Sequence, residues 1–98
     1  MMIAPLSESE RAAALAALPL WAYDEARGAL YRRISLGTFS RVFGLMACIA
    51  IEAEKRDHHP EWANVYDTLD IWLTTHDAGG VSTRDVQMAG LIDHLAVR

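Results

Sequence analysis

Cysteine, basic charge and long apolar runs are all scarce in this sequence of 98 residues. The one cysteine, Cys48, cannot form an internal disulfide, which excludes a disulfide scaffold and favours a reducing compartment. Its apolar neighbours predict a buried core residue rather than a nucleophile. The net charge of −4 argues against a general nucleic-acid surface, and no cluster of Lys and Arg indicates a local one.

The apolar segments are too short or too interrupted for a membrane protein. The longest run, Val42 to Ile51, cannot span a bilayer. Charged residues from Glu8 to Arg11 interrupt the N-terminal apolar segment, which is not typical of a secretory signal. We therefore expect a cytoplasmic protein that binds neither nucleic acid nor a membrane.

The composition is that of a folded chain. Apolar residues make up 52% of the sequence and charged residues 22%, which is typical of a globular protein and not of a disordered one. The length predicts a single domain over residues 1–98 with a modest core.

The first third of the chain predicts one helix and two strands. Residues 7–10 form a capping-box signature before an alanine-rich helix, which we expect to run to about Leu18 and to stop at Pro19. Two short strands are expected on either side of a turn at Arg27-Gly28. In the second strand the residues that share one face are Leu30, Arg32 and Ile34, and those on the other are Tyr31, Arg33 and Ser35.

A second helix is predicted by apolar residues that recur at spacings of three and four. This stripe, which we expect to face the core, comprises Phe39, Val42, Phe43, Met46, Ile49, Ala50 and Ala53. Three further apolar residues lie off the stripe and predict a second buried contact, with another subunit as one candidate: Leu45, Cys48 and Ile51.

The last third predicts two strands and a third helix: a first strand at about residues 62–66, and after Asp67-Thr68 a second, half-buried strand. From residue 69 to residue 76 the apolar side chains alternate with Asp70, Trp72, Thr74 and His76, so a strand would carry His76 on the face opposite the core. Ser82 is expected to cap the last helix, with Asp85 in its first turn. Its buried stripe comprises Met88, Leu91, Ile92 and Leu95.

The predicted fold is an α+β two-layer sandwich of order α-β-β-α-β-β-α, with helices on one face of a four-stranded, mainly antiparallel sheet.

A histidine pair makes residues 54–62 the chemically most informative stretch. His58 and His59 precede Pro60, which disfavours helical geometry at His59, so the second helix should end close to the pair. Carbonyl groups at a helix C-terminus favour a protonated imidazole, and a histidine that titrates near neutral pH is a natural general acid. Taken alone, such a pair is more often a solvated helix end than a catalytic site.

The spacing of further residues turns this pair into a signature. Glu54, three residues, His58-His59-Pro60, five residues, Tyr66, nine residues, His76, eight residues and Asp85 resemble the pattern of the pterin-4a-carbinolamine dehydratases. The text around the pair, residues 57–66, and around His76, residues 74–80, is similar as well. The resemblance extends to the opening helix and residues 18–21, and so covers nearly the whole chain.

The resemblance implies an enzyme that dehydrates 4a-hydroxytetrahydropterin, the product of aromatic amino acid hydroxylases, to quinonoid dihydropterin. It implies that His58 and His76 donate protons to the hydroxyl and that His59 mainly binds the pterin. The substrate pocket would be completed by Asp57 and by the run Thr74, Thr75, His76 and Asp77. Glu54 and Asp85 would support the site, although either also reads as an ordinary helix residue, exposed or capping. The chemistry requires no metal and no organic cofactor.

The resemblance also implies a homodimer or homotetramer built on sheet edges and helices, and a hydroxylase as pathway partner. Two alternatives stay open. One is a zinc enzyme that uses His58, His59 and His76 as ligands, although adjacent histidines rarely converge on one ion. The other is a non-catalytic module, either a dimerisation cofactor of a transcription factor, as in animal relatives, or a pterin-binding protein of molybdopterin metabolism.

Overall fold

The computed structural model describes residues 3–97 and confirms the predicted order of elements within them. The elements are α1 (Glu8–Ala16), β1 (Ala22–Asp24), β2 (Ala29–Ser35), α2 (Phe39–Arg56), β3 (Glu61–Val65), β4 (Thr68–Leu73) and α3 (Thr83–Ala96). A short 3-10 helix, η1 (His76–Ala78), lies between β4 and α3. Within the described residues, no helix is both long and apolar enough to cross a membrane.

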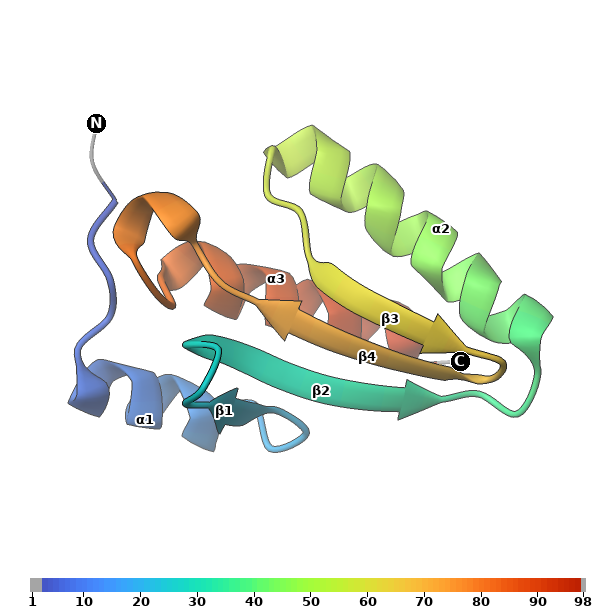
Figure 1. The fold of residues 1–98 in the computed structure, drawn as a ribbon, viewed down its shortest axis with the longest axis horizontal. Helices are drawn as coiled ribbons and strands as arrows, with labels where there is room; N and C mark the ends of the chain where they lie inside the picture. The colour runs from blue at the N-terminus through green and yellow to red at the C-terminus, as the bar shows by residue number, and fades with distance from the viewer. Residues whose placement is uncertain (1–2, 98) are drawn as a thin grey trace.

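The four strands form one antiparallel sheet in the order β1-β2-β4-β3. The long α2 connects β2 to β3, and both α2 and α3 lie on the same side of the sheet (Figure 1). α1 lies beside the short edge strand β1 (Figure 1). β4 occupies an inner position, so the residues that follow it emerge from the middle of the sheet.

Strict alternation along β2 and β4 creates the core between the sheet and the helices. Leu30 and Leu73 are paired across the two strands, as are Ile34 and Leu69, and all four are buried. Arg32, on the same face, donates a hydrogen bond of 2.6 Å to Asp93 of α3. From α3, the buried residues Met88 and Ile92 and the partly buried Leu91 and Leu95 pack on this layer, as the sequence predicted.

The outer face of the sheet carries polar and aromatic side chains. Asp70 on β4 accepts hydrogen bonds from Arg33 (2.8 Å) and from the Tyr31 hydroxyl (2.5 Å) on β2. The hydrogen bond from Arg33 lowers the pKa of Asp70, while the hydrogen bond to Asp70 raises the pKa of Tyr31. The Tyr31 ring lies 5.2 Å from the Trp72 ring, centroid to centroid, which makes this face a packed polar and aromatic layer.

The predicted core stripe of α2 is partly wrong. The buried residues of α2 are Val42, Leu45, Ile49 and Ala53, so Leu45 faces the chain's own core and not a second contact. Phe39 and Phe43 are 47% and 55% exposed, and Ala50 is exposed as well. Cys48, expected in the core, is half-buried. The face that contacts the sheet is therefore rotated from the one predicted, and aromatic residues of α2 are left at the surface.

Two predicted boundaries are also corrected. The capping box between Ser7 and Glu10 is present, but α1 ends at Ala16, two residues before Leu18. β4 ends at Leu73 instead of continuing to His76, because Thr75 turns back to form an isolated bridge with Gly80. His76 is consequently the first residue of η1 and not part of the strand.

The corrected orientation of α2 predicts that Leu45→Ala lowers the free energy of unfolding by about 3 kcal/mol, since a fully buried leucine leaves a cavity. Leu20→Ala is the matched control, because Leu20 is 60% exposed and should cost less than about 0.5 kcal/mol. Urea unfolding of the two variants measures the difference. Similar losses for both would contradict the assigned core face.

Candidate active site

A left-handed residue ends α2 directly before the two adjacent histidines. Asp57 follows the last helical residue with φ of 49°, a conformation that aspartate tolerates better than most residues. The His58 amide then donates back to the Ala53 carbonyl at 3.1 Å, which closes the helix end. After this turn the His58 side chain is buried, whereas that of His59 is 56% exposed.

His58 is paired with a buried carboxylate from the other helix. Its Nε2 lies 2.6 Å from Oδ1 of Asp85, and Asp85 is completely buried. A carboxylate only accepts hydrogen bonds, so Nε2 is the protonated nitrogen when Asp85 is ionised. Nδ1 is then the nitrogen of His58 that can exchange a proton with a ligand.

A chain of donors satisfies the second oxygen of Asp85. Oδ2 accepts from the Thr75 hydroxyl at 2.7 Å and from the Ser82 amide at 2.9 Å. The Ser82 and Thr75 hydroxyls are 2.6 Å apart, and the Ser82 hydroxyl accepts from the Arg84 amide at 3.2 Å. Since a buried carboxylate is stable only when its oxygens are satisfied, this network fixes Asp85 at the start of α3. Asp85 is both the N3 residue of the capping box of α3, whose N-cap is Ser82, and the partner of His58, so it fits both interpretations made from the sequence.

The other two histidines of the stretch each contact an exposed carboxylate. His59 Nε2 lies 2.8 Å from Oε1 of Glu54, one turn back on α2. His76 Nε2 lies 3.1 Å from Oε2 of Glu61, the first residue of β3. Each of the three imidazoles therefore uses Nε2 to contact a carboxylate, and only the pair with Asp85 is shielded from solvent.

An open cavity of about 290 Å³ joins these residues. It is lined by all seven predicted substrate-binding residues and by one more, Arg84: Asp57, His58, His59, Thr74, Thr75, His76, Asp77 and Arg84. Glu54 and Asp85 do not line the cavity, and they contact it through His59 and His58. The structure thus brings together every residue that the sequence assigned to a site, with the two supporting carboxylates behind the histidines.

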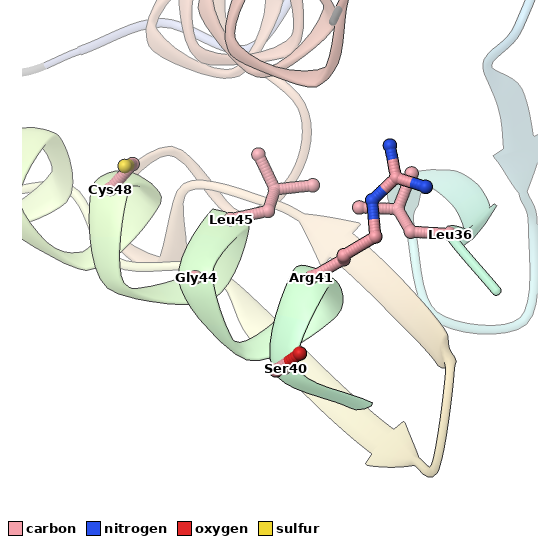
Figure 2. Close-up of a pocket in the computed structure, with 6 residues that line it drawn as sticks. All are labelled: Leu36, Ser40, Arg41, Gly44, Leu45 and Cys48. Atoms are coloured by element: carbon pink, nitrogen blue, oxygen red, sulfur yellow. The ribbon is translucent and has the colours of Figure 1, made fainter. Parts of the chain in front are cut away.

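A larger cavity, of about 470 Å³, lies along the first half of α2 (Figure 2). Its lining is Leu36, Ser40, Arg41, Gly44, Leu45 and Cys48, and Arg41 extends toward Leu36 (Figure 2). Its lining contains no histidine and no carboxylate, so it lacks the imidazole–carboxylate pairs of the smaller cavity.

The geometry gives no support to the zinc alternative. Among residues 3–97, no group of three or more His, Cys, Asp or Glu side chains is placed to hold a metal ion. His58 and His59 contact different carboxylates, Asp85 and Glu54, and only the first of these pairs is buried.

Three residues of the site were missed by the sequence reasoning. Glu61 contacts His76, Ser82 joins Thr75 to Asp85, and Arg84 lines the cavity. Glu61 follows directly after the His-His-Pro run, and Arg84 directly precedes Asp85. These residues lie close in sequence to predicted site residues, which could have marked them as candidates. Their contacts with the site depend on the fold and are not visible in the sequence.

The described residues thus form an α+β sandwich in which three imidazole–carboxylate pairs surround an open polar cavity. The chain matches the family model "Pterin 4 alpha carbinolamine dehydratase" over residues 4–95. It is 55% identical over 96 residues to a pterin-4-alpha-carbinolamine dehydratase of Rhizorhabdus wittichii, covering 98% of this chain and 99% of that one. A similarly named protein of Rhodopseudomonas palustris is 46% identical over 97 residues, covering 99% and 96%.

A solved structure agrees in three dimensions. The crystal structure of a transcriptional coactivator/pterin dehydratase from Brucella melitensis has a TM-score of 0.91 and 43% identity, covering 94% of this chain and 98% of that one. The chain belongs to the pterin-4a-carbinolamine dehydratase family, which is named for an enzyme, a hydro-lyase.

The network around Asp85 predicts that Asp85→Asn lowers the free energy of unfolding by about 1–3 kcal/mol. An asparagine side chain has one acceptor oxygen where aspartate has two. It therefore cannot accept both from His58 and from the Thr75 and Ser82 donors. Asp67→Asn is the control, since Asp67 accepts one 3.3 Å bond from Thr68 in a turn. Urea unfolding at pH 7 measures both variants. Equal stability of Asp85→Asn and the unaltered chain would contradict the structural role given to this carboxylate.

Proposed function

We propose that this protein is a dehydratase that converts 4a-hydroxytetrahydropterin to quinonoid dihydropterin and water by histidine general acid–base catalysis. The observation that carries the proposal is the convergence of His58, His59 and His76 on one cavity, each with a carboxylate partner. Membership of the dehydratase family supports the same reaction.

The reaction needs a proton delivered and a proton removed. The 4a-hydroxyl leaves only if it is protonated as the C–O bond breaks, while the lone pair of a ring nitrogen supplies the electrons that form the new double bond. A ring N–H proton is then lost, so that the net change is the release of one water. One positioned imidazole as acid and another as base each supply roughly 10²–10⁴-fold.

The predicted roles follow the environments of the three rings. His58 and His76 are proposed to deliver the proton to the hydroxyl, and His59 is proposed to hold the pterin. In His58 and His76 the carboxylate at Nε2 leaves Nδ1 for transfer, because a neutral imidazole has one donor and one acceptor nitrogen. The buried Asp85 orients His58 in a dry environment, where the pair is stronger than a surface pair.

The remaining cavity residues match the polar edge of a pterin ring. The carboxylates of Asp57 and Asp77 offer acceptors to ring N–H groups, and the guanidinium of Arg84 offers donors to the ring carbonyl. The hydroxyls of Thr74 and Thr75 are already used in hydrogen bonds to the Gly28 carbonyl and to Asp85. We therefore propose that Thr74 and Thr75 shape the cavity and that the charged residues bind.

The proposal extends to the setting of the enzyme. It comprises one dehydratase-like domain over residues 1–98, a cytoplasmic location and a place after an aromatic amino acid hydroxylase in pterin recycling. The single cysteine and the family support these parts of the proposal.

The assigned roles predict that His58→Ala and His76→Ala each reduce kcat for dehydration by roughly 10²-fold or more, while His59→Ala mainly raises KM. The substrate is generated in situ by a hydroxylase, and pterin absorbance follows its dehydration. His94→Ala is the matched control, because His94 lies exposed on α3 away from the cavity and should leave both constants unchanged.

Three outcomes would change the proposal. Equal turnover in His58→Ala and the unaltered enzyme would remove the proton-donor assignment. Activity lost with a chelator and restored by stoichiometric zinc would replace the acid–base account by the zinc account. If the unaltered protein gave no acceleration, the function would pass to a binding role or to another pterin, such as one of molybdopterin metabolism.

Exposed apolar residues on α2 favour a second property, self-association. Phe39, Phe43 and Ile51 are all about half exposed, at 47–59%. The centroids of the two phenylalanine rings are 5.6 Å apart, so the rings pack against each other. A helix face of this kind is a candidate protein contact. We propose that it joins copies of this chain into a homodimer or homotetramer; a module that binds another protein is the competing interpretation.

If α2 joins copies of the chain, Phe43→Glu should lower the molar mass measured by light scattering to that of a smaller species. Leu20→Glu should not, since Leu20 is equally exposed but lies outside α2. A monomeric mass for the unaltered protein would contradict self-association and would direct a search toward other protein partners.

A further inference from the structure

We propose that Glu61 is a positioning residue for His76, and that Arg27, stacked on Trp72, holds Glu61 in place. The hydrogen bonds on which this inference depends do not involve the substrate. Its catalytic consequence rests on the proposed dehydratase function.

His76 needs an external constraint more than the other two histidines do. Its side chain is 81% exposed, and it begins a 3-10 helix of three residues after the strand has ended. His58 is fixed by burial, and the His59 ring contacts Glu54 in the last turn of an 18-residue helix. Without a partner, an exposed imidazole would sample several rotamers, and a proton donor that is misplaced by about 1 Å loses about 10²-fold in rate.

Glu61 reaches His76 because of the register between β3 and β4. Glu61 is the cross-strand partner of Trp72, on the outer face of the sheet. His76 lies four residues beyond Trp72, and the Glu61 Oε2 atom is 3.1 Å from its Nε2. The Glu61 carboxylate on the edge strand β3 therefore reaches His76, which lies just after the end of β4.

A cluster of side chains from the β1–β2 turn restrains Glu61 from the opposite side. The Arg27 guanidinium lies over the Trp72 ring, 3.7 Å from its centroid, and its Nη1 is 3.9 Å from Oε1 of Glu61. Asp24 accepts a hydrogen bond from the Trp72 indole (3.0 Å) and one from the Arg27 amide (3.1 Å). A single exposed ion pair is weak, but stacking on a hydrogen-bonded indole restricts the arginine before it meets the carboxylate.

The two oxygens of Glu61 thus have different partners, Arg27 on Oε1 and His76 on Oε2. Arg27, Glu61 and His76 also line one shallow depression, which shares Thr74 and His76 with the catalytic cavity. The arrangement is a path of direct contacts from the outer face of the sheet to the site.

The chemical effect is to select one tautomer and one orientation of His76. A carboxylate at Nε2 requires a proton on that nitrogen, so the neutral ring carries its lone pair on Nδ1. When the imidazolium donates its Nδ1 proton, the neutral ring that forms already has Nε2–H bound to Glu61. No rotation of the ring is needed between protonation and transfer.

The first test needs no substrate. In Glu61→Ala, ¹⁵N shifts of the His76 ring at pH about 9, where an ordinary imidazole is neutral, are expected to show a mixture of tautomers, and the χ1 couplings are expected to average. The unaltered protein should show the Nε2–H form and one χ1 rotamer. Glu25→Ala is the matched control, since Glu25 is an exposed carboxylate in the same turn as Arg27 and does not line either cavity.

The second test is kinetic. Glu61→Ala is expected to lower kcat for dehydration about tenfold with little change in KM. Glu61→Gln, which keeps an acceptor oxygen, should recover most of the loss and the single tautomer. Arg27→Ala should give a smaller loss of kcat with partial averaging of the χ1 couplings.

The outcomes separate the inference from the proposed function. Unchanged ring shifts and χ1 couplings in Glu61→Ala would overturn the positioning role, whatever the activity. Unchanged couplings in Arg27→Ala would overturn the part given to the arginine. A protein that does not dehydrate the pterin but shows the predicted shifts would refute the dehydratase proposal alone and leave the positioning of His76 established.

Discussion

A buried carboxylate is the constraint on which the site depends. Asp85 is completely shielded from solvent, and its charge is compatible with the interior only because the His58 ring, the Thr75 hydroxyl and the Ser82 amide all point at it. These donors come from the end of α2, from the segment after β4 and from the start of α3. Satisfying one side chain therefore fixes the relative positions of three parts of the chain, and the cavity of the proposed active site lies where they meet.

The fold could be predicted because local patterns were clear where one face is buried and the other solvated. Alternation along β2 and β4 gave the correct inner and outer faces, and the capping residues gave both α1 and α3. The pattern failed on α2, where apolar residues occur on several sides. When a helix is apolar on several sides, periodicity alone does not show which side is buried. That depends on which side packs against the sheet.

Most of the residues that line the cavity could be named from the sequence, but the contacts between them could not. The spacing from Glu54 to Asp85, read through a family resemblance, named seven of the eight residues that line the cavity and the two carboxylates that contact His58 and His59, but not Arg84. It placed His76 on a strand, whereas the bridge between Thr75 and Gly80 ends the strand first. Glu61 was missed because its contact with His76 depends on the pairing of β3 with β4, which the sequence does not display.

The left-handed backbone at Asp57 has a consequence for the two histidines that follow it. In an α-helix each residue is rotated by about 100° from the previous one, so a helical residue at this position would carry His58 around the axis and away from α3. The positive φ instead ends the helix directly before His58, and the two imidazoles that follow have different surroundings, one buried and one exposed. Aspartate, asparagine or glycine can adopt this geometry at low cost, whereas a β-branched residue cannot. The conformation of this one residue thus helps to bring the imidazole of His58 to the buried carboxylate.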